Sequence, residues 1–205
     1  MPRSVWGSEG FRRAVAFAAV GHRDQVRRGS GVPYIVHPLL VARIVEEARF
    51  DELTVIAALL HDLVEDTPIT LNEIGMRFPK TVADIVAGCT EVKLDPDGRP
   101  IPWENRKRAH LDRLRVKARL EVRAVMLADK LDNLWSIQDD LKAGRPVWDQ
   151  FHADRERVLW YYASTIITCD CGDARIHNLA DACRLALDRV RVFDPKKSDF
   201  GGPMT

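Results

Sequence analysis

Four ionisable side chains crowd into six positions at His61, Asp62, Glu65 and Asp66, directly after the apolar run 55–60. On an α-helix of 3.6 residues per turn, the four would project from one side, over about 140° of arc. A buried carboxylate costs several kcal/mol unless it is paired or bound to a metal. The segment therefore indicates a helix that begins in a core and ends at a site. An amphipathic helix with a solvated polar face is the alternative, and the segment alone does not separate the two.

Two residues far away in the sequence have the side-chain types of metal ligands. His37 precedes Pro38, which restrains the chain there, and Asp129 lies inside the apolar stretch 125–131, which predicts that it is buried. Mixed nitrogen and oxygen ligands suit Mn, Fe, Zn or Mg. The alternative for Asp129 is a structural ion pair with Lys130 or another base. The predicted metal set is His37, His61, Asp62 and Asp129.

The elements that must position these residues are predicted to be helices throughout. Ser8 is a plausible N-cap, Thr70 and Glu73 have capping-box spacing, and 95–102 is a loop with three prolines and a glycine. No window shows sustained apolar alternation between hairpin turns. We therefore predict an all-α fold of about eight to ten helices. The expected helices span 8–25, 39–48, 51–65, 70–78, 79–92, 103–114, 120–140, 147–169 and 173–192.

Composition narrows the class of protein. The 205 residues carry a formal net charge of +1, so no global field favours nucleic acid or a membrane surface. No run of 18 apolar residues suggests a spanning helix, and the N-terminus lacks the apolar core of a signal peptide. A cytoplasmic protein with reduced thiols is expected. Residues 1–193 are predicted to form one domain, and the polar segment 194–205 a flexible C-terminal tail.

Three ordered motifs resemble those of a known family. Residues 28–38 read RGSGVPYIVHP and are similar to R-K-S-G-E-P-Y-I-x-H-P, and residues 61–67 read HDLVEDT and are similar to H-D-x-x-E-D-T. Residues 127–134 read LADKLDNL and are similar to K-L-A-D-R-L-H-N-M. These are signatures of the RelA/SpoT-type hydrolase domain of the HD superfamily of metal-dependent phosphohydrolases. No synthetase domain follows in this sequence, which therefore resembles a stand-alone small alarmone hydrolase.

The resemblance implies an HD-domain helical bundle that removes pyrophosphate from the 3′ position of ppGpp or pppGpp, usually with Mn²⁺. It implies that Glu65 and Asp66 act on the attacking water and that Asn133 contacts the substrate sugar. The nucleotide end would be shaped by Arg28, Ser30 and Tyr34. The expected partner is thus a small nucleotide, with no nucleic acid and no membrane, and a homo-oligomer is left open.

Four positions depart from the family pattern: Gly29, Val32, Asp24 and Asp132 replace a common Lys, Glu, Gly and His. Asp132 adds a negative charge beside the expected phosphate site. These departures leave the base preference and the exact substrate open. Two alternatives therefore remain, the same chemistry on another nucleotide and a catalytically silent nucleotide-binding regulatory module. Tyr161 or Tyr162 lining the site is a further hypothesis, and the basic run 106–123 is interpreted as a solvated helix face.

Overall fold

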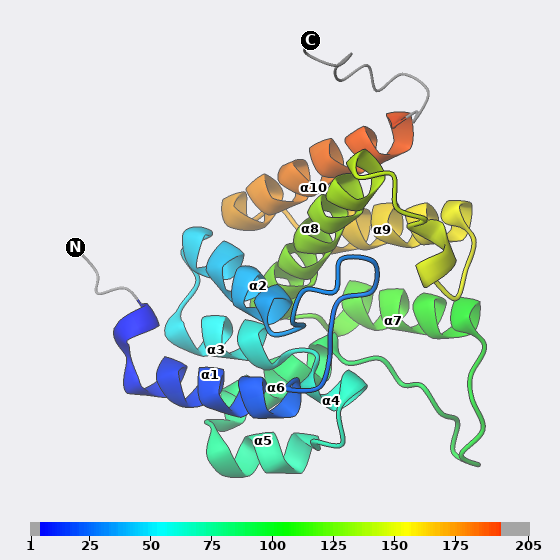
Figure 1. The fold of residues 1–205 in the computed structure, drawn as a ribbon. Coiled ribbons are helices and arrows are strands. Elements are labelled where there is room, and N and C mark those ends of the chain that lie inside the picture. Colours follow the sequence, from blue (N-terminus) through cyan, green and yellow to red (C-terminus); the bar gives the residue numbers. More distant parts are fainter. Residues whose placement is uncertain (1–4, 194–205) are drawn as a thin grey trace.

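The computed structural model describes residues 5–193 as helices joined by loops (Figure 1). Within this range the only β-structure is a pair of isolated bridges, Val26 with Pro33 and Leu94 with Pro100. The predicted all-α class is thus confirmed. The helices are α1 (Glu9–Gly21), α2 (Val36–Glu47), α3 (Glu52–Leu60), α4 (Leu63–Asp66), α5 (Leu71–Arg77), α6 (Lys80–Cys89), α7 (Trp103–Lys117), α8 (Leu120–Lys142), α9 (Arg155–Cys169) and α10 (Ala174–Val192), with 3-10 turns η1 (Val5–Gly7) and η2 (Trp148–Gln150).

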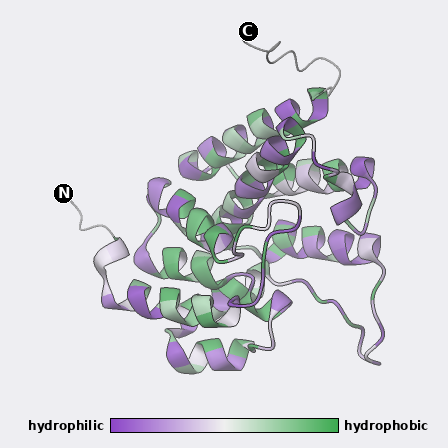
Figure 2. Cartoon of the chain, viewed as in Figure 1, coloured by the Kyte–Doolittle hydropathy of each residue, from purple (hydrophilic) through white to green (hydrophobic). Residues whose placement is uncertain are grey.

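Helix α8 is the central element of the fold. It packs against α2, α3, α6, α9 and α10, and Figure 1 shows it running between α2 and the α9–α10 pair. Helix α3 is the most apolar, and every side chain from Thr54 to Leu60 is buried. In Figure 2 α3 is largely green, whereas α7 carries much purple. A buried α3 therefore ends inside the molecule, where its last residues face α8.

Local signals explain where several helices begin. The Asp51 carboxylate accepts from the Thr54 N–H at 2.9 Å and caps α3. Thr70 and Glu73 form the predicted capping box at the start of α5. Ser8 accepts from the Phe11 N–H at 3.1 Å and caps α1, as predicted.

Some predicted helix boundaries are wrong. The expected helix 51–65 is broken: α3 ends at Leu60, and α4 begins only after His61 and Asp62. The break coincides with a ψ of −11° at Asp62 and with the His61 ring bonding to the Ala58 carbonyl. The expected helix 147–169 begins only at Arg155, the first residue of α9. The Asp154 side chain caps α9 by accepting from the Arg157 N–H, and the 3-10 turn η2 lies before it.

Smaller corrections concern helix ends and the range described. The expected helices 8–25 and 79–92 stop at the ends of α1 and α6, and α2 already begins at Val36, so that His37 lies in its first turn. The predicted tail 194–205 lies outside the described residues. Among the helices of residues 5–193, none is long and apolar enough to cross a membrane.

Candidate metal and nucleotide site

Two histidines and an aspartate from three helical segments meet at one point. His37 is on α2, His61 follows α3, and Asp129 is on α8; all three are buried. Each offers one potential ligand atom, and these atoms lie within 4.8 Å of one another. Asp129 Oδ1 is 3.4 Å from His37 Nε2 and 3.9 Å from His61 Nε2. Side chains up to 92 positions apart in the sequence therefore face one small volume.

Asp62 borders the same volume from the break between α3 and α4. Its Oδ2 is 3.3 Å from His37 Nε2, and its Oδ1 is 3.1 Å from His61 Nε2. Oδ2 also accepts a hydrogen bond of 2.7 Å from the Tyr34 hydroxyl. The four predicted metal ligands thus line a single cavity of about 150 Å³, which Glu65 also lines.

The hydrogen bonds of both histidine rings leave their Nε2 atoms available for a cation. His61 Nδ1 donates to the Ala58 carbonyl at 2.7 Å, and His61 Nε2 is buried without a hydrogen-bond partner among the described residues. His37 Nδ1 donates to Asp132 Oδ2 at 2.6 Å. A ring that donates through Nδ1 presents a lone pair at Nε2, the arrangement of metal-bound imidazoles. The donor set therefore fits a divalent metal ion.

The charges of the cavity lead to the same interpretation. Burial opposes ionisation of Asp129, yet Lys130 and the histidines hold the pKa of that carboxyl well below its usual range. Burial likewise opposes a charge on His37, but in the metal-free site the carboxylates of Asp129, Asp132 and Asp62 raise its pKa well above the usual range, so a bound cation would replace the proton on its Nε2. Burial also opposes ionisation of Asp62, but His61 and His37 hold the pKa of that carboxyl below its usual range. The ionised carboxylates of Asp129 and Asp62 thus attract positive charge to the cavity, and a divalent cation supplies more of it than a proton does.

Asp129 also makes the ion pair that its alternative interpretation predicts. Its Oδ2 accepts from Lys130 Nζ at 2.5 Å, while Oδ1 faces the two histidines and accepts from Asn133 Nδ2 at 2.5 Å. Lys130 in turn lies over the rings of Tyr161 and Tyr162. One carboxylate oxygen is therefore held by a lysine, and the other is directed at the cavity.

Glu65 and Asp66 on α4 have different environments. Glu65 Oε1 accepts from the Glu91 N–H at 2.9 Å, and burial raises the pKa of Glu65 to about 7. The Asp66 side chain is 41% exposed and pairs with Lys93 at 3.3 Å. A carboxyl group that titrates near neutral pH beside a metal cavity suits proton transfer. The geometry therefore favours Glu65 over Asp66 for that role.

The raised pKa of Glu65 predicts a pH-dependent stability. The folded protein binds this proton more tightly than the unfolded chain, whose carboxyl titrates near 4.5, so this group lowers stability as pH rises from about 4.5 to about 7. Glu65→Gln keeps an acceptor for the Glu91 N–H and removes the charge. We expect the metal-free variant to be about 1–3 kcal/mol more stable than wild type at pH 8 and nearly equal at pH 4.5. Urea unfolding with chelator measures this, and a wild type as stable as the variant at pH 8 would contradict it.

The negative charge that Asp132 adds is paired within the site. Asp132 is buried, and its Oδ2 lies 2.6 Å from His37 Nδ1 and 2.9 Å from Arg27 Nη2. The guanidinium neutralises the added charge, and the carboxylate orients His37. Arg27 also donates to Asn133 Oδ1 at 2.8 Å, which links the loop before α2 to α8.

Removing the Asp132 carboxylate, which orients His37, should weaken metal binding. Asp132→Asn keeps the size of the side chain but loses the charge that orients His37 and increases its basicity. Substitution of a residue that hydrogen-bonds to a metal-binding histidine typically lowers metal affinity by about 10–100-fold. We expect a loss of that size in calorimetric titration with Mn²⁺. Asp139→Asn on the exposed side of α8 is the control, and equal affinities for wild type and Asp132→Asn would contradict the role.

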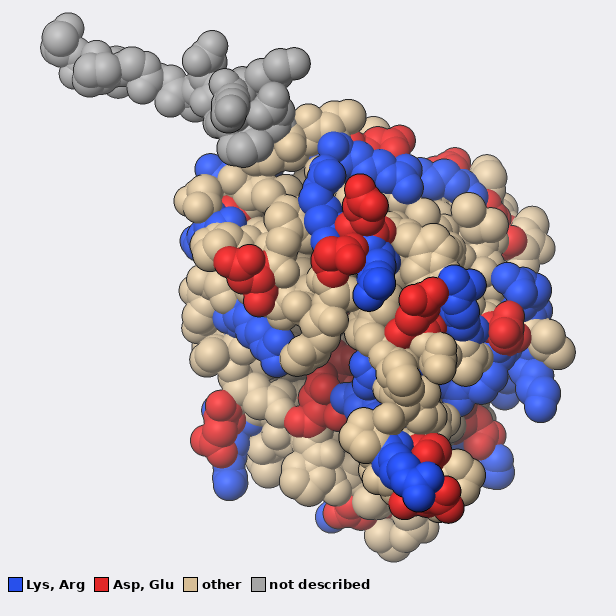
Figure 3. Space-filling model, turned by 90° about the vertical axis from the view of Figure 1, so that its right-hand side faces the viewer, with Lys and Arg blue, Asp and Glu red and all other residues tan. Residues whose placement is uncertain are grey.

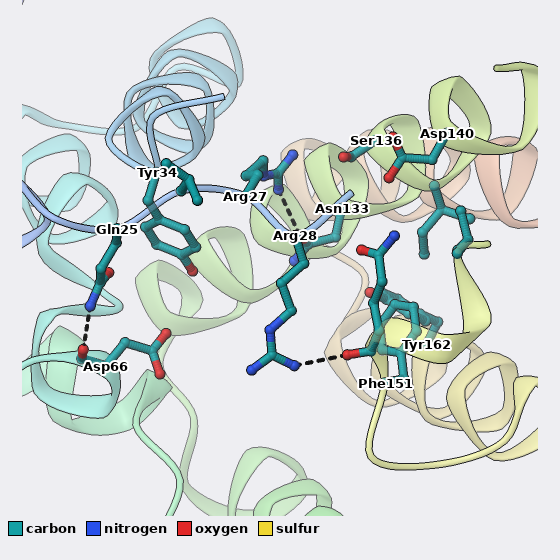
Figure 4. Close-up of a pocket in the computed structure, with 14 residues that line it drawn as sticks. Gln25, Arg27, Arg28, Tyr34, Asp66, Asn133, Ser136, Asp140, Phe151 and Tyr162 are labelled. Carbon is teal, nitrogen blue, oxygen red and sulfur yellow. Dashed lines mark hydrogen bonds between the residues drawn. The ribbon is translucent and has the colours of Figure 1, made fainter. Parts of the chain in front are cut away.

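A second, larger cavity of about 500 Å³ adjoins the first (Figure 4). The two share Tyr34 and Asn133, whose side chains line both. Arg28 lines the larger one and donates to the Gln150 carbonyl at 2.9 Å, as the dashed line in Figure 4 shows. Ser30 does not line it; its hydroxyl lies 3.4 Å from the Val32 N–H in the exposed loop. Three of the four predicted substrate-contacting residues therefore lie at this pocket.

Several residues of the two cavities were not among the candidates. Tyr161 lines the metal cavity and Tyr162 lines the larger pocket, so both of the tyrosines considered lie at the site. The side chain of Glu91 is only 6% exposed and accepts from Lys107 and from the Tyr161 hydroxyl. The additional charged and polar residues include Gln25, Arg27, Glu91, Lys107, His110, Lys130, Ser136, Asp140 and Gln150. Periodicity on α8 could have indicated Ser136 and Asp140, whereas nothing in the basic run distinguishes Lys107.

The other charges of the basic run are mostly solvated. Arg108 pairs with Glu104, and Arg115 pairs with Asp112, all four with exposed side chains. Figure 3 shows acidic and basic side chains interspersed over this face of the molecule. The basic run therefore does not form a continuous positive surface there.

The fold and site define an all-α protein with a histidine–aspartate centre of the metal-binding type. A family model described as HD domain matches residues 14–154. The chain belongs to the HD-domain family.

Relatives within this family extend the comparison. The chain is 38% identical over 156 residues to the Danio rerio guanosine-3′,5′-bis(diphosphate) 3′-pyrophosphohydrolase MESH1, covering 75% of this chain and 79% of that protein. It is 37% identical over 138 residues to an Aquifex aeolicus protein with the same enzyme name, covering 65% of this chain and 19% of that protein. It is also 37% identical over 129 residues to the Escherichia coli bifunctional (p)ppGpp synthase/hydrolase SpoT, covering 17% of it. The chain thus spans less than a fifth of these two bacterial relatives.

Solved structures agree with these relatives. One, described as a metazoan ortholog of SpoT that hydrolyzes ppGpp, has a TM-score of 0.71 at 27% identity, covering 88% of this chain and 96% of the other. Another, from Listeria monocytogenes EGD-e, has a TM-score of 0.62 at 34% identity, covering 74% and 99%. The resemblance to the RelA/SpoT-type HD domain that the motifs indicated is therefore confirmed.

Proposed function

We propose that this chain is a metal-dependent 3′-pyrophosphohydrolase that converts ppGpp or pppGpp to GDP or GTP and pyrophosphate. The observation that carries the proposal is the meeting of His37, His61, Asp62 and Asp129 in one cavity that opens beside a nucleotide-sized pocket. Relatives named for this reaction, one of them similar over most of its length, support the choice of substrate.

The proposed ligands are the four side chains named above, with Mn²⁺ as the proposed metal because it accepts mixed nitrogen and oxygen donors. When bound, the metal supplies Lewis acidity toward the phosphoryl oxygens and toward a water molecule. The Tyr34 hydroxyl holds Asp62 at 2.7 Å, and Lys130 holds the outer oxygen of Asp129. These contacts restrict the ligand rotamers, so that the centre is positioned before the substrate arrives.

Glu65 is the proposed general base, with Asp66 beside it on α4. In the reaction, a water oxygen forms a bond to the phosphorus attached to the 3′ oxygen, and the bond between that phosphorus and the 3′ oxygen breaks. Glu65 accepts the proton of the water, and the leaving 3′ oxygen ends protonated as the ribose hydroxyl. Asn133, which lines both cavities, is placed to contact the sugar between phosphate and base. Arg28 and Tyr34 are the further proposed substrate contacts.

The remaining proposals concern the surroundings of the enzyme. A small nucleotide is the proposed partner, in agreement with the near-neutral charge of the chain, and nucleic acid is not. All four cysteines carry free thiols, which supports a reducing compartment such as the cytoplasm. A homo-oligomer stays a prediction that light scattering tests.

A nucleotide panel tests the proposal. Purified protein with Mn²⁺ is incubated with ppGpp, pppGpp and other nucleotides, and pyrophosphate and phosphate are measured with and without chelator. We expect pyrophosphate from ppGpp and a loss of release when the metal is removed. Turnover of another nucleotide but not of ppGpp would support the same chemistry on a different substrate. Binding without turnover of any nucleotide would support the silent regulatory module.

A further inference from the structure

The larger pocket ends in a polar corner that the proposed reaction does not use. Ser136, Asp140 and Gln150 line this pocket and not the metal cavity. Asn133, Ser136 and Asp140 recur at helical spacing on α8 and continue the line that starts at Asp129. From Asp129 to Asp140 the helix rises about 16 Å. A nucleotide whose 3′ phosphate lies at the metal centre would therefore extend its base toward Asp140.

Asp140 offers an unused acceptor at this end of the pocket. Its side chain is buried, with 5% of the residue exposed, and its Oδ1 accepts from Arg145 at 2.5 Å. Oδ2 has no hydrogen-bond partner among the residues that the structure describes. Figure 4 shows the Asp140 carboxylate next to Ser136 at the edge of the pocket. The corner thus contains a carboxylate oxygen that no described residue uses and that lines the pocket, where a donor of a ligand can reach it.

Gln150 places a donor beside the Asp140 carboxylate, where the backbone of Gly29 passes close to both. A Cβ on Gly29 would fall 2.5 Å from Gln150 Nε2 and 3.0 Å from Asp140 Oδ2, so the loop backbone approaches both atoms closely. The φ of Gly29 is +84°, a conformation that side chains other than glycine rarely adopt. In this chain the absence of a side chain leaves the amide of Gln150 and the carboxylate of Asp140 together at the pocket end.

We propose that Asp140 and Gln150 recognise the base and select guanine over adenine, an inference that rests on the proposed function for the position of the 3′ phosphate. Guanine presents the donors N1–H and the N2 amine, which match the Asp140 carboxylate, and the acceptor O6, which matches the Gln150 amide. Adenine would direct its N1 lone pair at the carboxylate and its N6 amine at the amide. A buried polar site discriminates strongly against a ligand that leaves its groups unpaired. Phe151 and Ile137 supply apolar pocket surface for the ring faces.

The test compares kcat/KM for the guanosine, inosine and adenosine 3′,5′-bis(diphosphates) in wild type and Asp140→Asn. In wild type we expect a guanosine preference over adenosine of at least about tenfold, with inosine intermediate because it lacks the N2 amine. Asp140→Asn should lower the guanosine to adenosine ratio by about tenfold or more. Asp139→Asn, at an exposed position one residue earlier, should leave the ratio unchanged.

Two further variants distinguish recognition from a structural role of Asp140. Arg145→Gln removes the ion pair but keeps the carboxylate, so the base preference should persist even if stability falls. Gln150→Leu removes the donor to O6 and should lower the preference independently of Asp140. Equal use of guanosine and adenosine substrates by wild type would overturn the inference, as would a ratio unchanged in both Asp140→Asn and Gln150→Leu.

Failure of the proposed function would give a different result. If wild type hydrolyses no 3′-diphosphate nucleotide, the proposed activity is wrong, and calorimetry with guanosine and adenosine 3′,5′-bisphosphate still measures the base preference. Tighter binding of the guanosine compound, lost in Asp140→Asn, would support the inference. Equal affinities, or no binding of either compound, would overturn it.

Discussion

Asp129→Ala is expected to abolish pyrophosphate release, with a fall in kcat/KM of at least about 10³-fold. The substitution removes the oxygen that lies 3.4 Å and 3.9 Å from the two histidine nitrogens. A metal ion contributes several kcal/mol to transition-state stabilisation, and each 1.36 kcal/mol is a factor of ten in rate. The measurements are pyrophosphate release from ppGpp and metal content of the purified protein. Both should fall together.

This variant also leaves the buried Lys130 without its partner, so folding must be separated from catalysis. Loss of one partner of a buried ion pair costs about 3–5 kcal/mol. Asp129→Asn keeps the size of the side chain and an oxygen acceptor, and it should fold while binding metal weakly. Asp139→Ala on the solvent side of the same helix should retain full activity. A folded Asp129→Asn with wild-type metal content and wild-type turnover would show that the centre is not where we place it.

Glu65→Gln should lower kcat by about 10²–10⁴-fold while KM changes little. The side chain is proposed to accept a proton from the attacking water, and an amide does not do so. In wild type, kcat should rise with pH as Glu65 deprotonates. Its pKa is raised to about 7 by burial, and a bound cation would lower it, so the rise is expected at or below pH 7.

The pH profile distinguishes this role from a structural one. The acidic limb of the profile should disappear in Glu65→Gln, because the titrating group is gone. Glu47→Gln, the same chemical change at an exposed site on α2, is the matched control and should leave rate and profile unchanged. A Glu65→Gln enzyme that retains its acidic limb would assign the base to another group, with Asp66→Asn the next variant to measure.

The helix break at His61 and Asp62 illustrates where sequence reasoning stopped. The apolar run 55–60 correctly indicated a buried helix, and the predicted caps at Ser8 and Thr70 act within three residues of themselves. The periodic pattern gave no sign that the helix would break at His61. The break depends on a ring bonding to the Ala58 carbonyl and on ligands that must face α2 and α8 at once.

The effects of the two departures Asp132 and Gly29 depend on neighbours that lie far away in the sequence. Asp132 meets His37 across 95 positions of sequence, and Arg27 meets Asn133 across 106. The negative charge that Asp132 adds is neutralised by Arg27, which lies in a distant loop and approaches the carboxylate to 2.9 Å. Gly29 gains its significance from Asp140 and Gln150, which approach it from α8 and from η2.

The sequence by itself determined the helical class of this protein, most helix starts, and the set of histidines and aspartates that meet. These features follow from signals a few residues long, namely caps, apolar periodicity, prolines and motif spacing. Only the tertiary structure decided which nitrogen of each ring faces the cavity, how strongly Glu65 is desolvated, and which residues form the far end of the pocket. Desolvation, hydrogen-bond partners and cavity shape arise between segments remote in sequence, so no local pattern encodes them.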